Sequence, residues 1–341
     1  MNNLTTIDLD KQPVAELEDL SDQIPVIDMS LLFGSEAGDS ARNNIIKEVE
    51  TACRNWGFFQ VINHGISSEL ITKVTQQCAL FFKQTARQKD EVRRTFENPW
   101  GYYNNELTKN QRDKKEIFDF TVPGVDPIYS GTNRWPRDFP SSGIFLEYQA
   151  QCVILASHLT QVFCAGLGLP NDTLNSHFVN HTGFTRLNYY PVSDPLHGST
   201  VEHLPTADLG VHHHTDAGIL TVLLQDQVGG LQVYREGYWH NVKPIENAFV
   251  INTGDMMQVW SNNQYMAAMH RVLAMDSKDR YSIPFFFNPS ADSEILPLPP
   301  NVTASKPAQY RSINWGKFRN GRTSGDYADY GKEVQISDFL I

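Results

Sequence analysis

The chain has 341 residues, of which 40% are hydrophobic and 20% are charged, and its formal net charge is −11. This composition predicts a globular protein with a sizeable core and excludes a disordered or fibrous one. The acidic balance argues against a nucleic-acid partner, because phosphate groups repel an acidic surface and no basic stripe interrupts this one.

The amino-terminal stretch MNNLTTIDLDKQPVAELEDL is polar and acidic. It has neither the apolar core of a signal peptide nor the arginine-rich character of a transit peptide, and no later segment is apolar over the length of a membrane span. We therefore expect a cytoplasmic protein without a membrane partner. The widely spaced cysteines, Cys53, Cys78, Cys152 and Cys164, predict buried free thiols, which suit a reducing compartment.

The first 120 residues predict helices and short strands. Residues 24–32 begin as a strand, residues 39–56 have the spacing of a helix, and residues 57–66 form a strand that ends in an Asn-His-Gly turn. Residues 67–84 predict an amphipathic helix with a serine cap. The apolar side of that helix is expected to contain Leu70, Val74, Leu80 and Phe81.

Farther along the chain the pattern changes to short runs rich in β-branched and aromatic residues. These runs cover residues 184–192, 218–227, 230–237, 238–245, 248–255, 256–263, 270–276 and 280–289, and turn sequences such as Gly-Gly and Asn-Asn separate them. Many short strands at this spacing predict a β-sandwich or a closed jelly roll. The tail after residue 300 is expected to pack over the end of the core.

The stretch GVHHHTDAG, residues 210–218, contains the first candidate functional residues. Side chains two apart in a strand point the same way, so His214 and Asp216 share one face. His270, between two apolar runs, is predicted to lie across an antiparallel pairing from them. Two histidines and one carboxylate form the facial triad that binds Fe(II) and leaves neighbouring positions open. Taken alone, the His-x-Asp pair is also compatible with a solvated loop or with chance.

Other metal sites fit this stretch less well. A closed structural zinc site uses four ligands, usually with cysteines among them, and no cysteine here is placed for it. The pattern His212-x-His214-x-Asp216 is similar to that of binuclear zinc hydrolases, but Ala217 stands where those enzymes have a further histidine. We expect His213 to point away from His214, and His212 to support a ligand or to lie at the rim.

A second candidate group follows ten positions after His270. Arg280 and Ser282 are two apart in a predicted strand, so a guanidinium and a hydroxyl lie side by side. Together they can bind a carboxylate, which arginine holds through two hydrogen bonds. Most Arg-x-Ser pairs are structural, but the position of this one just after the distal histidine makes it more specific.

Ordered motifs over most of the chain resemble the isopenicillin N synthase-like superfamily of non-haem Fe(II), 2-oxoglutarate-dependent dioxygenases. IPVIDMS and CRNWGFFQVINHGI are similar to the amino-terminal segment of that family, and DKKEIFDF followed by NRWP is similar to its middle. LNYYP, HTD, GGLQV, VINTGDMMQVWSN, HRV and RYSIPFF resemble its catalytic core in the same order.

The resemblance implies an α+β fold with a β-rich core, a double-stranded β-helix or jelly roll, an N-terminal helical region and flanking helices. The implied segments are an N-terminal region over residues 1–120, the catalytic core over 121–300 and a tail over 301–341. The implied cofactor is Fe(II), the cosubstrates are 2-oxoglutarate and O2, and ascorbate is the candidate reductant.

The resemblance also assigns roles to residues. It implies that iron binds to His214, Asp216 and His270, and that the distal carboxylate of 2-oxoglutarate binds to Arg280 and Ser282. Asn188 and Tyr190, on one strand face, match positions that touch the cosubstrate in relatives, whereas Tyr189 points the other way. The implied reaction oxidises a C–H bond of a small organic metabolite by hydroxylation, desaturation or cyclisation, and releases succinate and CO2.

Arg186 gives a first indication of the substrate. It shares strand parity with Asn188 and Tyr190, and relatives have a substrate-contacting basic residue at the matching position. A buried arginine needs an anionic partner. We therefore expect a carboxylate-bearing, amino-acid-derived natural product. The alternative is a salt bridge from Arg186 to an acidic residue of the protein.

Further substrate contacts are expected from two aromatic segments. Phe286 matches a position that packs on substrate rings in relatives, although it could equally belong to the core. Tyr102, Tyr103 and Asn104 lie in WGYYNNE, which resembles a segment that forms a pocket wall; a polar surface loop is the alternative. The basic tail residues predict a solvated face rather than a binding patch. They are Lys317, Arg319 and Arg322.

Other functions remain as alternatives. One is an Fe(II) oxidase of the same superfamily that does without 2-oxoglutarate, which the intact Arg280 and Ser282 pair argues against. Others are an oxygenase of a neutral phenolic or terpenoid substrate, a zinc hydrolase, and a non-enzymatic jelly-roll binding protein. The expected partner is a small-molecule substrate. We expect the protein itself to be a monomer, because no heptad pattern or long apolar edge strand is evident.

Overall fold

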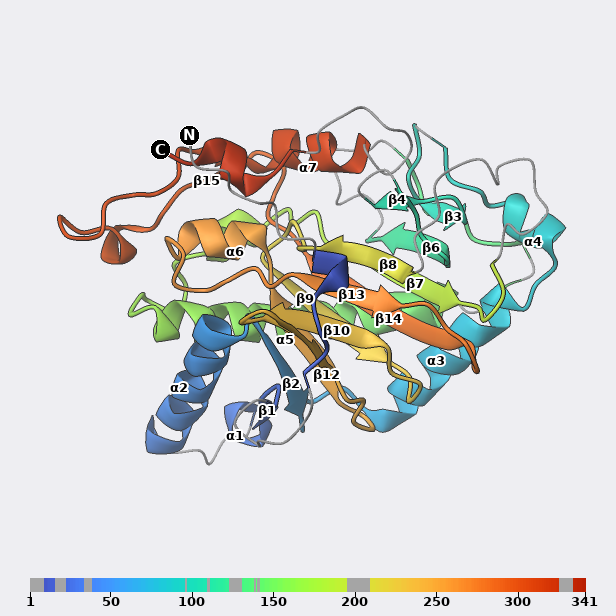
Figure 1. Ribbon diagram of the computed structural model, residues 1–341, viewed down its shortest axis with the longest axis horizontal. Coiled ribbons are helices and arrows are strands. Elements are labelled where there is room, and N and C mark those ends of the chain that lie inside the picture. The colour runs from blue at the N-terminus through green and yellow to red at the C-terminus, as the bar shows by residue number, and fades with distance from the viewer. Residues whose placement is uncertain are drawn as a thin grey trace.

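The computed structural model describes residues 9–15, 23–33, 39–95, 97–108, 111–122, 131–137, 139, 142–194, 209–324 and 334–341. Two β-sheets with helices around them make up most of this part of the chain (Figure 1). The helices are α1 (Ser30–Phe33), α2 (Asp39–Asn55), α3 (Ser68–Phe82), α4 (Ala86–Asp90), α5 (Ser142–Gly166), α6 (Asp255–Trp260) and α7 (Trp315–Ser324). Short 3-10 turns span Leu9–Lys11, Asn175–Phe178, Pro299–Asn301 and Ile336–Phe339.

The strands are β1 (Val26–Asp28), β2 (Phe58–Ile62), β3 (Gly101–Tyr103), β4 (Leu107–Thr108), β5 (Gln111–Arg112), β6 (Glu116–Thr121), β7 (Phe184–Tyr190), β8 (Leu209–His214), β9 (Leu220–Gln225), β10 (Leu231–Arg235), β11 (Tyr238–Asn241), β12 (Phe249–Thr253), β13 (His270–Leu273), β14 (Arg280–Phe287), β15 (Glu294–Ile295) and β16 (Ile313–Asn314). The large sheet has the order β1-β2-β12-β9-β14-β7-β6-β3, and the small sheet has the order β11-β10-β13-β8. In the large sheet β1 pairs in parallel with β2, and the remaining pairs are antiparallel.

The two sheets pack against each other through apolar side chains that alternate along their strands. Strand residues two apart face the same side, so each strand contributes every second residue to this layer. From the large sheet these residues are Phe58, Tyr190, Leu223 and Val250, and from the small sheet they are Val211, Leu231, Val233 and Val272. The arrangement confirms the predicted β-rich, jelly-roll core.

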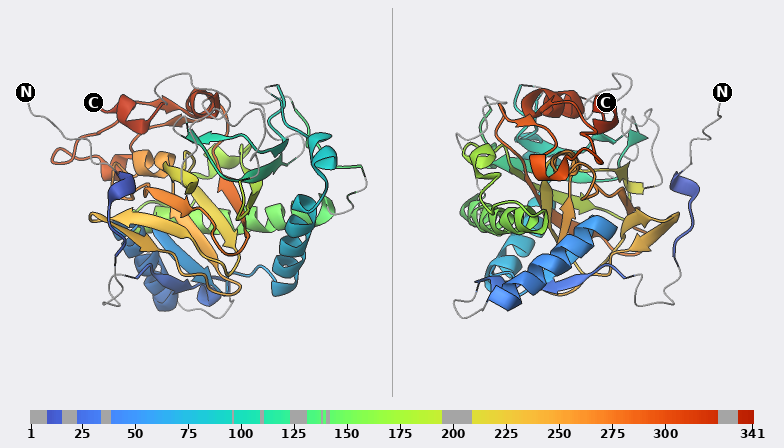
Figure 2. Two further views of the ribbon diagram at one scale, coloured as in Figure 1. Left: turned by 45° about the vertical axis from the view of Figure 1, so that its right-hand side comes forward. Right: turned by 90° about the vertical axis from the view of Figure 1, so that its left-hand side faces the viewer.

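Helices α2, α3 and α5 cover the other face of the large sheet (Figure 2). Helix α3 begins as the sequence predicts: Ser67 accepts a hydrogen bond from the backbone N–H of Leu70, which satisfies one of the free amides of the first turn. Leu70, Val74 and Phe81 are buried, but Leu80 is 52% exposed. The prediction for Leu80 was wrong, because this side chain faces outward from the helix although the next residue, Phe81, is buried.

Two elements differ from the sequence-based expectations. Residues 256–263, predicted as a strand, begin with helix α6. This run is buried on all sides, so its hydrophobicity has no period that separates a helix from a strand. Helix α5, with 25 residues of which eleven are buried, is an element that the sequence patterns did not predict.

Strands from the first 120 residues lie in the same sheet as those of the later part. Strands β1, β2, β3 and β6 extend the large sheet on both sides, and one continuous apolar core reaches from Ile27 to Phe318. The boundaries at residues 120 and 300 stay a prediction. All four cysteines are buried and free. Within the described residues, no helix combines the length and the apolar character needed to cross a membrane.

Candidate metal and cosubstrate site

The three predicted iron ligands come together at one end of the small sheet. His214 is the last residue of β8, and it pairs directly with His270, the first residue of β13. Asp216 follows β8 by two positions. The Nε2 atoms of His214 and His270 each lie 3.7 Å from Oδ1 of Asp216, and the three candidate ligand atoms all lie within 4.8 Å of one another. These atoms are close enough to bind a single ion.

Backbone carbonyl groups orient both imidazoles. Nδ1 of His214 lies 2.8 Å from the carbonyl oxygen of His212, and Nδ1 of His270 lies 3.0 Å from that of Ala268. A carbonyl accepts a hydrogen bond, so each Nδ1 carries the proton and each Nε2 keeps its lone pair for a metal. Burial, together with the nearby His270, lowers the pKa of His214 to about 3, which favours the neutral, metal-binding form.

Hydrogen bonds orient Asp216 in a similar way. Its Oδ2 accepts hydrogen bonds from the side chains of Thr221 and of Asn252, the latter at 2.7 Å, so that Oδ1 faces the two histidines. Burial by itself would raise the pKa of Asp216, but the neighbouring His270 and His214 and these two hydrogen bonds lower it. The carboxylate is therefore ionised in the form that a divalent cation requires.

The segment after β8, which links His214 to Asp216, is held from two sides. Nη2 of Arg322, in α7, donates a hydrogen bond of 3.0 Å to the carbonyl oxygen of Thr215. The backbone N–H of Asp255 donates one of 2.8 Å to the carbonyl oxygen of Asp216. The close contact between Asp255 and Asp216 requires a glycine at position 254, because a Cβ atom on Gly254 would lie 2.8 Å from the carbonyl oxygen of Asp216.

Arg280 and Ser282, on β14, line a cavity that His214, Asp216 and His270 line as well. Arg280 is only 1% exposed, and its guanidinium carbon lies 4.9 Å from the ring centre of Tyr190. Nη2 donates to Oε1 of Gln225 at 3.3 Å, while Nε and Nη1 have no hydrogen-bond partner among the described residues. A buried cation with unsatisfied donors fits an anionic ligand.

Asn188 completes this group from the neighbouring strand β7. Asn188 pairs with Ser282 in the sheet register, and its Nδ2 donates to the Ser282 hydroxyl at 3.3 Å. Within the described residues, Oδ1 of Asn188 and Nε2 of Gln225 also lack partners. The predicted residues Asn188, Tyr190, Arg280 and Ser282 thus line one cavity. Their donor set fits a small dicarboxylate whose far end lies on Arg280.

A second cavity, of about 170 Å³, adjoins the first one and shares His214 and Asp216 with it. Phe286 lines both cavities, and its ring stacks on Phe184 with the ring centres 4.8 Å apart. The predicted contact between Phe286 and a substrate is therefore compatible with its position. The lining of this second cavity consists of Glu106, Leu107, Thr108, Lys115, Phe184, Arg186, Val211, His214, Thr215, Asp216, Ala217, Gly218, Phe286, Asn288, Trp315, Arg319 and Arg322.

Arg186 lines both cavities, but it has acidic partners within the protein. Its guanidinium donates two hydrogen bonds to Asp119, at 2.7 and 2.8 Å, and two to Glu106, at 2.8 and 2.9 Å. This is the alternative that the sequence analysis left open. A substrate carboxylate is not needed to neutralise Arg186, and the expected contact between Arg186 and a substrate stays a prediction.

The structure places Tyr102, Tyr103 and Asn104 outside the lining of both cavities. The hydroxyl of Tyr102 donates to Glu116 at 2.9 Å, Tyr103 lies against the guanidinium of Arg94, and Asn104 accepts a hydrogen bond from Arg93. The lining of the two cavities does not support the predicted substrate contacts of this segment, and these contacts stay a prediction. The segment that does reach the cavity starts two residues later and contains Glu106, Leu107 and Thr108.

The tail contributes residues that the sequence analysis assigned to a solvated face. Lys317 is indeed exposed, but Arg319 is only 6% exposed and Arg322 is half-buried, and both line the second cavity. Trp315, Arg319 and Arg322 recur at helical spacing in α7, so they share one face. That periodicity was the signal that could have identified this wall.

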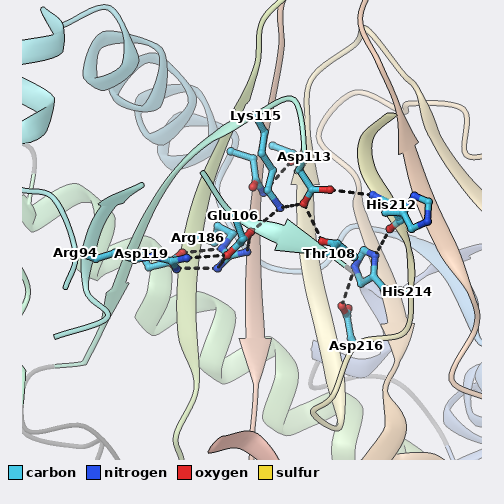
Figure 3. A network of polar contacts seen from close by, with 12 residues as sticks. Arg94, Glu106, Thr108, Asp113, Lys115, Asp119, Arg186, His212, His214 and Asp216 are labelled. Carbon is cyan, nitrogen blue, oxygen red and sulfur yellow. Dashed lines mark hydrogen bonds and ion pairs between the residues drawn. The ribbon is translucent and has the colours of Figure 1, made fainter. Parts of the chain in front are cut away.

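Buried ion pairs connect the cavity wall to the strand that carries the ligands (Figure 3). Glu106 binds Arg186, Arg94 and Lys115, and Lys115 continues to Asp113 with an Nζ–Oδ2 distance of 3.0 Å. Burial alone would raise the pKa of Glu106, but these three cations lower it. Burial raises the pKa of Asp113 despite the opposing charge of Lys115.

Comparisons with known proteins agree with this site. Residues 181–289 match the model of the 2OG-Fe(II) oxygenase superfamily, and residues 24–138 match that of the non-haem dioxygenase in morphine synthesis N-terminal region. Jasmonate-induced oxygenase 2 of Arabidopsis thaliana is 33% identical over 324 residues, which cover 92% of this chain and 83% of that relative. 1-Aminocyclopropane-1-carboxylate oxidase 5 of the same plant is 36% identical over 308 residues, which cover 86% of this chain and 92% of the relative.

A solved structure of JOX2 in complex with 2OG, Fe and JA superimposes with a TM-score of 0.78 at 28% identity and covers 97% of this chain and 90% of that one. A full-length Neurospora crassa protein solved with alpha-KG and 5-formyluracil gives a TM-score of 0.74 at 28% identity, with coverage of 86% and 93%.

Proposed function

Because the chain belongs to the 2OG-Fe(II) oxygenase superfamily, we propose that it oxidises a C–H bond of a small organic carboxylate bound in the cavity beside His214 and Asp216. The observation that supports this type of reaction is that a candidate metal site and a candidate carboxylate-binding arginine share one cavity. A His-Asp-His triad, in which Asp216 and His270 are buried, lines the same cavity as Arg280, a buried arginine with two donors that lack a partner among the described residues.

The residues of the chain have separate tasks in this reaction. His214, Asp216 and His270 would hold Fe(II), while Arg280 and Ser282 would hold the far carboxylate of 2-oxoglutarate. Bound Fe(II) with 2-oxoglutarate and O2 supplies the oxidising power, and 2-oxoglutarate leaves as succinate and CO2. The protein contributes position and the exclusion of water, because Phe184 and Phe286 form an apolar wall next to the ligands.

Arg319, rather than Arg186, is our candidate for binding the substrate carboxylate. Arg319 lines the second cavity from α7, where Nη1 donates to the carbonyl oxygen of Thr182 at 3.1 Å. Its guanidinium carbon lies 5.5 Å from the ring centre of Phe184, which lines the same cavity. A guanidinium can hold a carboxylate through two hydrogen bonds, and this supports binding of an anion in the cavity.

The names of the relatives do not choose the substrate by themselves. One is an oxidase named for 1-aminocyclopropane-1-carboxylate, and another, from Matthiola incana, is named naringenin 3-dioxygenase. The first experiment therefore measures O2-dependent succinate release with Fe(II) and 2-oxoglutarate. It compares a pool of amino-acid-like carboxylates and other small carboxylates with a pool of neutral phenolics and terpenoids.

The proposal is supported if the carboxylate pool stimulates succinate release and if the Michaelis constant for the active carboxylate rises at least about tenfold in Arg319→Gln. Lys317→Gln is the matched control, because Lys317 lies exposed on the same helix. Stimulation by the neutral pool alone keeps the oxygenase function and contradicts the carboxylate. Oxidation of a substrate without any 2-oxoglutarate requirement would instead support the oxidase alternative.

A further inference from the structure

The strand that carries the candidate iron ligand His214 lies at the edge of its sheet. The order of the small sheet is β11-β10-β13-β8, so among the described strands β8 has a partner on one side only. Backbone N–H groups on the other side of an edge strand need a different acceptor when they are buried. His212, on β8, is buried, and its backbone N–H is such a group.

Asp113 supplies this acceptor. Its Oδ1 accepts a hydrogen bond of 3.1 Å from the backbone N–H of His212, while Oδ2 binds Thr108 at 2.8 Å and Lys115 at 3.0 Å. Asp113 is 1% exposed. The next residue, Lys114, also reaches the edge, since its N–H donates to the carbonyl oxygen of Leu209 at 3.4 Å.

The main chain of His212 transmits this contact to an iron ligand. Its N–H is held by Asp113, and its carbonyl oxygen accepts the hydrogen bond from Nδ1 of His214. The two hydrogen bonds lie on opposite ends of one residue, so a rotation of this backbone would change the direction in which the His214 ring points. Figure 3 shows this series of contacts from Lys115 through Asp113 and His212 to His214.

We propose that Asp113 is a positioning residue for the metal site: its carboxylate fixes the backbone of His212, which in turn fixes the ring of His214 for metal binding. The inference rests on the proposed function, because it assigns Asp113 a role toward the iron that the triad would hold. Partners of metal-binding histidines commonly change metal affinity by about tenfold or more when they are removed.

The test compares Fe(II) and Co(II) affinities of the full-length protein and its variants, measured by anaerobic titration, together with the visible absorption spectrum of bound Co(II). Asp113→Ala removes the acceptor, and we expect at least an about tenfold weaker affinity and an altered Co(II) spectrum. Asp113→Asn keeps an oxygen that can accept from His212, and we expect it to rescue most of the affinity. Hydrogen exchange at the His212 amide should accelerate in Asp113→Ala and stay near wild type in Asp113→Asn.

The matched control is Glu116→Ala. Glu116 is also a buried carboxylate with a lysine partner, Lys89, but it lies on β6 and lines neither cavity. We expect Glu116→Ala to lower the melting temperature and to leave the metal affinity unchanged. An equal loss of affinity in Glu116→Ala, or a wild-type affinity in Asp113→Ala, would overturn the proposed role of Asp113.

A measurement on the wild-type protein covers the case in which Asp113→Ala does not fold. Coupling between two sites is reciprocal, so metal binding should slow hydrogen exchange at the His212 amide more than at the Tyr234 amide, which lies on β10 of the same sheet. If metal binding slowed hydrogen exchange equally at both amides, the proposed role of Asp113 would be overturned and the proposed function would be unaffected. A wild-type protein that binds neither Fe(II) nor Co(II) would overturn the proposed function as well.

Discussion

Arg186 binds Asp119 through two parallel hydrogen bonds, with Nε 2.7 Å from Oδ1 and Nη2 2.8 Å from Oδ2. Asp119 faces Arg186 directly across the β6–β7 pairing. An arginine and a carboxylate in this geometry form a strong and specific ion pair. Asp119 is buried and Arg186 is partly buried, so loss of the arginine removes a cation from two buried carboxylates, Asp119 and Glu106.

We therefore predict that Arg186→Leu mainly affects stability. Removal of one partner from a buried ion pair costs about 3–5 kcal/mol, because the remaining carboxylates stay buried without it. Chemical denaturation should show this loss in the free energy of unfolding. The double variant Arg186→Leu/Asp119→Leu should recover part of it. A single variant as stable as wild type would show that the ion pair does not contribute to folding.

Glu106 predicts a pH dependence of stability. The surrounding cations lower its pKa in the folded protein below the ordinary value of 4.5. Its stabilising contribution is therefore fully present above pH 4.5 and is lost as the pH falls from there toward the lowered pKa. We expect the stability difference between wild type and Glu106→Gln to be largest near neutral pH and to shrink in acid. A difference that grows with acidification would contradict the assigned direction.

Arg280 predicts a specific loss of cosubstrate binding. Its Nε and Nη1 atoms both lack partners within the described part of the chain, and a lysine cannot replace these two donors in one plane. Arg280→Lys should raise the Michaelis constant for 2-oxoglutarate by at least about tenfold, which corresponds to about 1.4 kcal/mol. Steady-state kinetics with varied 2-oxoglutarate would test this. An unchanged constant would place the cosubstrate elsewhere.

The triad predicts a strict metal requirement. Treatment with a chelator should abolish O2-dependent succinate formation, and Fe(II) should restore it. Zn(II) should not, because zinc binds similar ligands but has no redox chemistry. Hydrolytic activity of the Zn(II) form without O2 would instead favour the zinc hydrolase alternative.

Local sequence patterns were sufficient for the residues that lie close together along one strand. Arg280 and Ser282 are two positions apart on β14, and the two-residue period of a strand places them on one face wherever the strand lies. His214 and Asp216 have the same spacing, but Asp216 lies beyond the last residue of β8 and reaches the site from the following loop. The same period placed Arg186, Asn188 and Tyr190 on a common face, and all three line the cavity. Helix α6 could not be identified this way, because burial on all sides removed its period.

The surroundings of these residues depended on the tertiary structure. Arg186 is 80 residues from Glu106 and 67 from Asp119 along the chain, and Arg322 contacts a residue 107 positions away. No local pattern encodes such neighbours, since they depend on which strands pair and where α7 packs. The sequence by itself determined the residue types that can bind a metal and a carboxylate. Only the tertiary structure decided which charges are neutralised within the protein and which face the cavity, because ion pairing depends on distance in space.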